Sequence, residues 1–411
     1  MAAVLKTLTV HGVDIPVIFE EDHYLPMVSM QLVFGESGSM ADTIAGEAKM
    51  AARLLGEGTR RDGAIAFAQK LESQAITLSA YAGRESLVVM LSALKEAFDY
   101  GTQLAAELFA DPNVTPEAFA TVQQRMLGSV HQKESNLDHI ASLTLKSILF
   151  QDTPRERPAD GTPETLARLT RDDLDRFLSR HLGLGNATVV IGGDLSWDDA
   201  ARWIERMLQP LSSHDLDALP FCAANPSGTL LREVRPGDQA YIYFGAPFEV
   251  PYDGDETHLA KVAGFVLGSS GFGSRLMEEI RVKRGLAYSA YGRFALERTA
   301  HYFTGHLQTK LESETEAIEV VREVVSTFVH KGITAEELEA AKQFLLGSEP
   351  LRTETLSRRL ARAYHEYYSR QPLGSGQQEL QRIETLTLET INAFIREHDE
   401  IEALSFGIVG A

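Results

Sequence analysis

Cysteine is almost absent from this chain of 411 residues, in which Cys222 is the only one. A single cysteine excludes any disulfide within the chain and any metal site built from several cysteines. A chain without disulfides is typical of a reducing compartment. Residues 1–20 also lack the uninterrupted apolar stretch of a signal peptide. We therefore expect a cytoplasmic protein, or a periplasmic one if a leader has been removed.

Long apolar runs and an excess of basic residues are missing as well. No stretch of 18 apolar residues occurs, so the sequence predicts no membrane-spanning helix. Lys and Arg number 39 against 58 Asp and Glu, a net charge of −19. This balance argues against nucleic acid and anionic membranes as partners, because both require a cationic face. The remaining composition, 44% hydrophobic and 24% charged, is that of a globular chain with one or two real cores.

An internal repeat relates the ends of the two halves of the chain. Residues 169–193 and 386–410 align at a constant offset of 217 residues. The aligned pairs are Thr170 with Thr387, Leu174 with Ile391, Phe177 with Phe394, His181 with His398, Ile191 with Ile408 and Gly193 with Gly410. Each segment has a Thr at a helix N-cap, apolar residues at helical spacing and a short β-rich run that ends in Gly. We infer a duplicated unit of about 200 residues.

The repeat predicts two α+β halves, each a mainly antiparallel sheet with helices on one face. The halves are expected at 1–208 and 229–411, joined by a linker at 209–228 that contains three prolines. Strands are predicted at 27–34, 86–91 and 240–244. Helix starts are predicted where Thr precedes Pro-Glu or stands three residues before Glu, at Thr115, Thr162 and Thr334.

The most specific stretch of the sequence lies in the second half, GSSGFGSRLMEEIRVKRGLAYSAYGRF at 268–294. It resembles the signature of the pitrilysin, insulinase and mitochondrial processing peptidase family of zinc peptidases. The run DHYLPMVSMQLVFGESGSMAD at 22–42 resembles the strand and turn that precede the metal helix of that family. Together with the duplicated layout, the resemblance covers most of the chain.

The chain departs from this family at the metal helix. Family members carry an inverted zinc motif, G-L-A-H-x-x-E-H followed by Gly-Thr, in which two His bind zinc and the Glu is the general base. Residues 46–59 keep this frame, but the ligand positions hold Lys49 and Arg53 and the base position holds Ala52. A third ligand, a Glu about 75 residues further on, is also missing from the window 128–130. Ammonium and guanidinium groups offer no lone pair at neutral pH, so we expect no metal in this chain.

The resemblance implies that other parts of the peptidase machinery remain. Its Arg and Tyr, seven residues apart, correspond to Arg281 and Tyr288 here. In the family this pair hydrogen-bonds the substrate backbone and the oxygen that becomes negative during hydrolysis, so both are assigned as catalytic. Family members also bind peptides along a sheet edge, which suggests Ser79, Ala80 and Tyr81 as substrate-binding residues.

These features favour a non-metal subunit of a heterodimeric zinc peptidase. In this interpretation a homologous partner supplies the zinc and the base, and the substrate is a peptide. A purely structural subunit, like the core subunits of respiratory complexes, is the alternative. A homodimer and an autonomous hydrolase with an unrecognised metal site are the other hypotheses that the sequence leaves open.

Several other polar groups are weaker candidates. His131, Glu134 and His139 are predicted to lie along one long helix, where His139 is two turns away from the other two. His301 and His306 are predicted on opposite faces of a strand, because they are five residues apart.

Two further motifs have ordinary structural explanations. His365 and Glu366 are predicted at a helix surface or an interface. The run GSSGFG at 268–273 is followed by Ser-Arg, which fails the phosphate-loop pattern and indicates a helix-capping turn.

Overall fold

The computed structural model describes residues 2–411 and divides them into two compact units. The first unit comprises Met1–His131, Pro158–Leu219 and Leu351–Gly374. The second comprises Gln132–Arg157, Pro220–Pro350 and Ser375–Ala411. Within residues 2–411, no helix has both the length and the apolar character needed to cross a membrane.

Each unit contains one mixed sheet. The first has the order β1-β2-β6-β3-β5-β4 and the second β7-β11-β8-β10-β9. The strands of the first are β1 (Val4–Val10), β2 (Val13–Glu21), β3 (Met27–Gly35), β4 (Thr77–Ala82), β5 (Ser86–Leu94) and β6 (Ala187–Gly193). Those of the second are β7 (Leu230–Val234), β8 (Gln239–Pro247), β9 (Ala287–Glu297), β10 (Ala300–Lys310) and β11 (Ser405–Gly410).

The two sheets have the same topology. The order β2-β6-β3-β5-β4 becomes β7-β11-β8-β10-β9 when five is added to each strand number. The first sheet has one further strand, β1, which pairs antiparallel with β2. Within the shared five-strand order the first pair is parallel, β2 with β6 and β7 with β11, and the following pairs are antiparallel. The predicted α+β fold with two mainly antiparallel sheets is confirmed, as are the strands predicted at 27–34, 86–91 and 240–244.

Helices account for most of the remaining chain. In chain order they are α1 (Glu47–Leu55), α2 (Gly63–Glu72), α3 (Lys95–Ala110), α4 (Pro116–Glu134), α5 (Leu137–Leu149), α6 (Pro163–Arg168), α7 (Arg171–His181), α8 (Trp197–Leu208), α9 (Thr257–Gly264), α10 (Arg275–Met277), α11 (Glu314–Lys331), α12 (Ala335–Gly347), α13 (Glu349–Thr353), α14 (Leu356–Tyr368), α15 (Ser375–Thr385) and α16 (Leu388–Glu397). The predicted N-caps are confirmed, because a Thr hydroxyl accepts a backbone N–H in each case: Thr115, Thr162, Thr170, Thr334 and Thr387.

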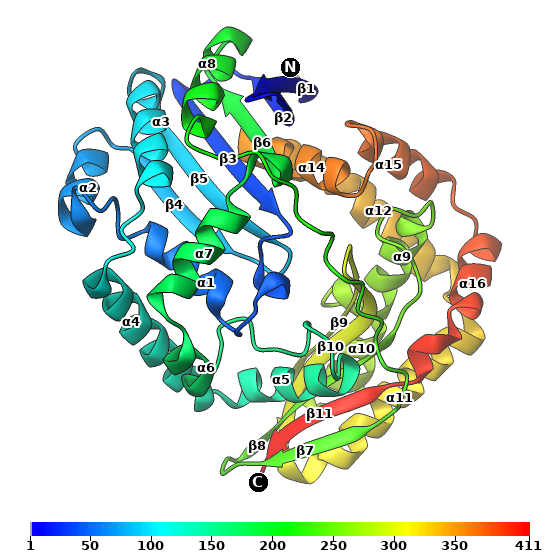
Figure 1. Cartoon of the computed structure of the whole chain (residues 1–411). Coiled ribbons are helices and arrows are strands. Elements are labelled where there is room, and N and C mark those ends of the chain that lie inside the picture. Colours follow the sequence, from blue (N-terminus) through cyan, green and yellow to red (C-terminus); the bar gives the residue numbers. More distant parts are fainter. Residues whose placement is uncertain (1) are drawn as a thin grey trace. The chain divides into compact units, whose positions relative to one another are not determined.

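Alternating residues divide the first sheet into two faces. Val17 and Phe19 of β2 point into the main core, which helices of the same half of the chain cover. Ile18, between them, lies on the opposite face and forms one hydrophobic cluster with Val190 of β6 and Leu360 of α14. The second face of this sheet is therefore covered by a helix from the second half of the chain (Figure 1).

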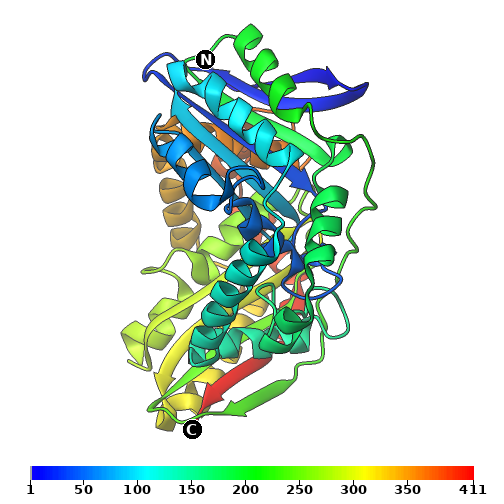
Figure 2. The same ribbon diagram turned by 60° about the vertical axis from the view of Figure 1, so that its left-hand side comes forward.

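The second sheet is covered in the same way, here by a helix from the first half of the chain. Ile408 of β11 belongs to the main core of its unit, and the adjacent Val409 packs against Ile140 and Ala141 of α5. Helix α5, shown in teal, runs along the red strand β11 in Figures 1 and 2. Each half of the chain thus provides one helix, α5 or α14, that packs on the sheet of the other half, and we call these the exchanged helices. Most other helices cover the opposite face of each sheet, as the sequence predicts. The predicted halves 1–208 and 229–411, with a linker at 209–228, describe the duplication along the sequence and stay a prediction. The compact units of the structure have different bounds.

Candidate functional site

The helix that corresponds to the metal helix is α1, and its frame is kept for structural reasons. The buried Asp42 carboxylate accepts hydrogen bonds from the backbone N–H of Gly46 (2.9 Å) and of Ala48 (2.8 Å), which caps the start of α1. Beyond its end, Gly58 has a φ of +75°, and a Cβ there would lie 2.6 Å from Cβ of Phe67. The Asp and the Gly of the family pattern are therefore needed by the fold.

On α1, the positions of the family's two zinc ligands and of its general base hold two basic side chains and an alanine. Lys49 and Arg53 lie one turn apart on the face of α1 away from the core. The Lys49 ammonium forms an ion pair with Asp160, with 2.8 Å between Nζ and Oδ1. Ala52 is 2% exposed and contributes a methyl group to the hydrophobic core. None of these groups can bind zinc or accept a proton from water.

The window for the third ligand lies on α4. Val130 belongs to the core of the first unit, and Gly128 and Ser129 provide no carboxylate. Within residues 2–411, no three His, Cys, Asp or Glu side chains converge in a way that could hold a metal ion. The residues present do not fit the zinc centre of the family.

Arg281 and Tyr288 lie in direct contact within the second unit. Arg281 belongs to η4 (Glu278–Lys283), a wide helical segment of the π type, which is common at functional sites. Beyond the end of this segment, Gly285 has a φ of +64° and turns the chain into β9, where Tyr288 lies. The guanidinium carbon of Arg281 is 4.4 Å from the centre of the Tyr288 ring, a cation–π contact.

The hydrogen-bonding groups of this pair have no partner in the described part of the chain. Within residues 2–411, neither the Arg281 guanidinium nor the Tyr288 hydroxyl forms a hydrogen bond or an ion pair with another group of the chain. The Tyr288 side chain is 81% exposed. Both groups are strong donors and remain available to a ligand.

A third residue, Phe272, completes this cluster and was not identified from the sequence. Its ring centre lies 4.6 Å from the guanidinium carbon of Arg281, and its side chain is 69% exposed. Two exposed rings therefore contact the same guanidinium, which limits the orientations of Arg281. An aromatic residue between two glycines, in GFG, was the available signal.

The run 268–273 is the capping turn that the sequence predicts. The Ser274 hydroxyl accepts the N–H of Met277 and caps α10. Gly268 has a packing role, since a Cβ there would lie 2.6 Å from the backbone N of Gly292 in β9. Close approach of two backbones therefore explains Gly268, whereas Gly271 and Gly273 have positive φ angles of +69° and +98° that favour glycine.

The predicted substrate-binding residues Ser79, Ala80 and Tyr81 lie on β4, at one edge of the first sheet. β4 pairs only with β5, so its other edge has no strand partner within residues 2–411. Tyr81 is half-exposed. Strand β9, which carries Tyr288, occupies the same edge position in the second sheet. An open edge is the geometry required for adding a peptide strand, and the binding role stays a prediction.

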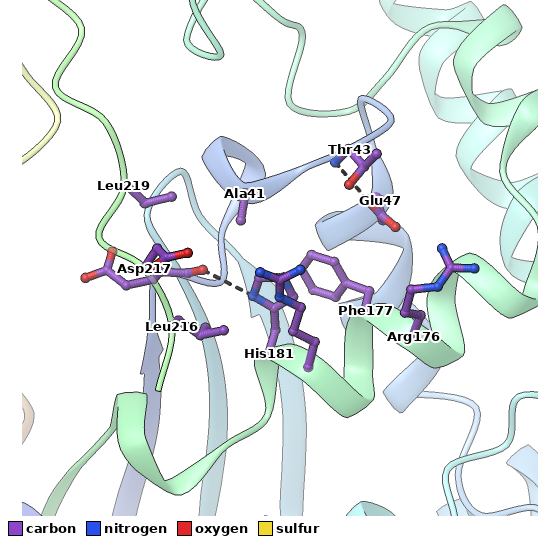
Figure 3. A pocket seen from close by; sticks show the side chains of 11 residues that line it. Ala41, Thr43, Glu47, Arg176, Phe177, His181, Leu216, Asp217 and Leu219 are labelled. Carbon is purple, nitrogen blue, oxygen red and sulfur yellow. Dashed lines mark hydrogen bonds between the residues drawn. The ribbon is translucent and has the colours of Figure 1, made fainter. Parts of the chain in front are cut away.

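A cavity of about 220 Å³ lies between the start of α1, helix α7 and the chain at 216–219 (Figure 3). Glu47 of α1 lines one side, and burial raises the pKa of its carboxyl group. His181 lies against the Phe177 ring, with 4.2 Å between ring centres. Its Nδ1 donates to the backbone carbonyl of Glu36 (3.2 Å). Burial and the nearby Arg180 charge lower the pKa of the His181 imidazole to about 4.

This pKa predicts a specific acid sensitivity. A folded-state pKa of about 4, against 6.5 for an ordinary His, means that the unfolded chain binds the extra proton as the pH falls from 7 to 4. Stability present above pH 6.5 is therefore lost on acidification, by about 1–2 kcal/mol between pH 7 and pH 5 for this group. We expect His181→Gln to reduce the slope of unfolding free energy against pH in that window, measured by urea titration.

The matched control for that experiment is His23→Gln. Exposed His23 lies 2.6 Å from Asp194 and 2.9 Å from Glu21, and these carboxylates raise its pKa. Its contribution is present at low pH and is lost as the pH rises, so His23→Gln should change the slope in the opposite sense. Equal slopes for wild type and His181→Gln would contradict the assignment.

The remaining polar candidates do not form a site. The single long helix predicted across His131, Glu134 and His139 is wrong, because α4 ends at Glu134 and α5 begins at Leu137. Asn136 produces the break, since its side chain accepts the N–H of His139 and caps α5.

The other predicted histidines also have structural surroundings. His301 lies near Phe221 and Tyr252, whereas His306 contacts Tyr243, so the two do not converge, as predicted. His365 is at a helix surface, but its neighbour Glu366 is buried and accepts the backbone N–H of Gly374.

A helix with the frame of an inverted zinc motif, without its ligands and on duplicated α+β units, defines a peptidase fold that has lost its metal site. Comparison with known families agrees. Residues 16–162 match the insulinase family, peptidase family M16, and residues 168–345 match the peptidase M16 inactive domain. The chain belongs to peptidase family M16, as the sequence resemblance indicates, and lacks the zinc motif of that family.

Individual relatives extend over nearly the whole chain. The chain is 41% identical to a Helicobacter pylori protein named non-peptidase homolog YmxG, over 99% of this chain and 94% of that protein. A crystal structure of a peptidase M16 inactive domain from Pseudomonas fluorescens has a TM-score of 0.91 at 24% identity, covering 99% of this chain and 98% of that one. A chain of complex III2 from Candida albicans has the same fold, with a TM-score of 0.78 at 16% identity and coverage of 99% and 96%.

Proposed function

We propose that this chain is the zinc-less subunit of a two-chain zinc peptidase and that it contributes Arg281 and Tyr288 to the site of a zinc-bearing homologue. The observation that carries the proposal is the contrast between two motifs. The segment of the metal helix keeps Asp42 and Gly58, which the fold requires, but has Lys49, Ala52 and Arg53 at the positions of the zinc ligands and the general base. The Arg281–Tyr288 pair lies in contact, and its donor groups form no hydrogen bond with the rest of residues 2–411.

The division of chemistry follows from these groups. The homologue would hold the zinc with its H-x-x-E-H motif, which would supply Lewis-acid activation of the scissile carbonyl and of water, and its motif Glu would be the general base. Arg281 and Tyr288 donate hydrogen bonds to the peptide backbone and to the oxygen that becomes negative in the tetrahedral intermediate. The peptide adds to a sheet edge such as β4, where Ser79, Ala80 and Tyr81 contact it.

A structural role without any peptidase function is the second candidate. The likeness to a chain of complex III2 favours it, since that chain has the same fold within a large assembly. In this case the free donors of Arg281 and Tyr288 would have no substrate, and the surfaces of the two units would provide contacts only.

Reconstitution distinguishes the two candidates. The pure chain with excess zinc is assayed against a quenched fluorescent peptide, alone and mixed with a homologue that carries an intact H-x-x-E-H. We expect cleavage only in the mixture, and its loss when a chelator is added. The homologue alone, and the homologue with Gln in place of its motif Glu, are the controls. A stable complex without cleavage would indicate the structural role, and cleavage by this chain alone would contradict both.

A further inference from the structure

A second cavity, in the second unit, is not used by the proposed peptidase role. It encloses about 290 Å³ between α5 and the strands β8, β9 and β10. We call it the tyrosine pocket, because Tyr243, Tyr291 and Tyr302 line it together with His306. A well-formed pocket with aromatic walls and a few polar groups is the usual form of a small-molecule site.

The aromatic walls of the tyrosine pocket are uncharged at neutral pH. The His306 ring lies between Tyr243 and Tyr291, with ring centres 5.2 Å and 5.8 Å away. Burial lowers the pKa of His306, which keeps the imidazole neutral. The Tyr243 hydroxyl donates to Asp138 at 3.0 Å, and burial raises its pKa. These rings therefore offer apolar faces to a ligand.

The charged side chains that line the pocket are both basic. They are Arg293 of β9 and Lys146 of α5, and no Asp or Glu is among the lining residues. Within residues 2–411, the exposed Arg293 guanidinium donates to no protein acceptor. In a chain with a net charge of −19, this Arg293 guanidinium, in a pocket without a lining carboxylate, indicates an anionic ligand.

The fold itself does not require this set of residues. Strand pairing places Tyr243, His306 and Tyr291 in one row across β8, β10 and β9, next to Gly407 of β11. The equivalent row of the first sheet passes through Val190 of β6, at the repeat offset of 217 residues. Its members on β3, β5 and β4 are Gln31, Met90 and Ser79. The second sheet thus has the aromatic row and the first sheet, with the same strand order, does not. The fold can therefore form without these aromatic side chains.

We propose that the tyrosine pocket binds a small carboxylate with an aromatic or apolar carbon skeleton. The planar guanidinium of Arg293 takes the carboxylate through paired N–H···O bonds, and the skeleton lies against the tyrosine rings. The volume equals that of about ten water molecules, which suits a single arylalkanoate or one aromatic residue. The carboxylate is that of a free acid or the C-terminus of a short peptide.

Calorimetric titration of the chain alone with N-acetylphenylalanine tests this proposal independently of any peptidase role. We expect saturable binding that is about tenfold or more weaker with N-acetylphenylalaninamide, which has the same size without the charge. Arg293→Gln should weaken binding of the acid by a similar factor. Arg396→Gln, which removes an exposed cation of α16 outside the pocket, should leave it unchanged.

The outcomes separate clearly. No binding of the acid, equal binding of acid and amide, or equal affinity of Arg293→Gln and wild type would each overturn the proposal. A hexapeptide that ends in Phe distinguishes the two sources of the carboxylate. Its binding at the affinity of the free acid would assign the pocket to peptide C-termini, and its exclusion would assign the pocket to small acids.

Discussion

Replacing Arg359 by methionine is expected to lower the free energy of unfolding by about 3–5 kcal/mol. Arg359 lies on the exchanged helix α14, and its Nε donates to Glu20 at 2.6 Å while its Nη2 donates to Asp22. The Glu20 side chain on β2 is fully buried, and its second oxygen, Oε2, has no hydrogen-bond partner within the described residues. Removing the guanidinium leaves this carboxylate without its counter-charge inside the protein.

Urea unfolding followed by circular dichroism measures this effect. Arg358→Met is the matched control, because Arg358 is 54% exposed and lies 3.8 Å from an exposed carboxylate, so a change of about 0.5 kcal/mol or less is expected. Adding Glu20→Gln to Arg359→Met should recover part of the loss, since the buried charge is then absent. Equal stability of Arg359→Met and wild type would show that the ion pair does not hold α14 on the sheet.

In the reconstituted peptidase, Arg281→Ala and Tyr288→Phe are each expected to lower kcat by about 100-fold. In the proposed role each variant removes a donor to the developing negative charge, and a preorganised donor of this kind contributes about 3 kcal/mol to the transition state. Arg281→Lys should recover little of the activity, because an ammonium lacks the planar fork and loses the contacts with Phe272 and Tyr288.

The control for these variants is Arg284→Ala, which removes a nearby guanidinium that is paired with Glu279. Its kcat should equal that of the wild type. Thermal melting and size-exclusion chromatography establish that each variant is folded and still binds the homologue. Unchanged kcat in both Arg281→Ala and Tyr288→Phe would contradict the catalytic role, and loss of the complex alone would indicate an interface role.

The loss of metal chemistry could be predicted from the sequence by itself. Whether a side chain can bind zinc depends on the atoms that it carries, and Lys49, Ala52 and Arg53 carry no free lone pair in any conformation. The duplication could also be predicted from the sequence, because helix caps and the spacing of apolar residues are local patterns, and both recur at an offset of 217 residues. The matching topology of the two sheets confirms that the halves share one fold.

The exchange of α5 and α14 could not be predicted, because an apolar stripe on a helix does not specify which sheet will cover it. The alternation that makes Ile18 and Val409 point away from the main cores requires a cover on the second face. Which helix supplies that cover depends on the path of the whole chain. The break at Asn136 was missed for a different, local reason, since one side-chain cap within four residues decides it.

The sequence by itself determined what this chain cannot do, namely bind zinc at the family site, and which pair of donors it keeps. Only the tertiary structure decided what surrounds those groups. The contact of Phe272 with Arg281 forms across the turn between them, and the row of Tyr243, His306 and Tyr291 joins residues of three different strands. Chemical capacity belongs to single side chains, whereas a binding site arises from strand register and packing, which every element of the fold helps to set.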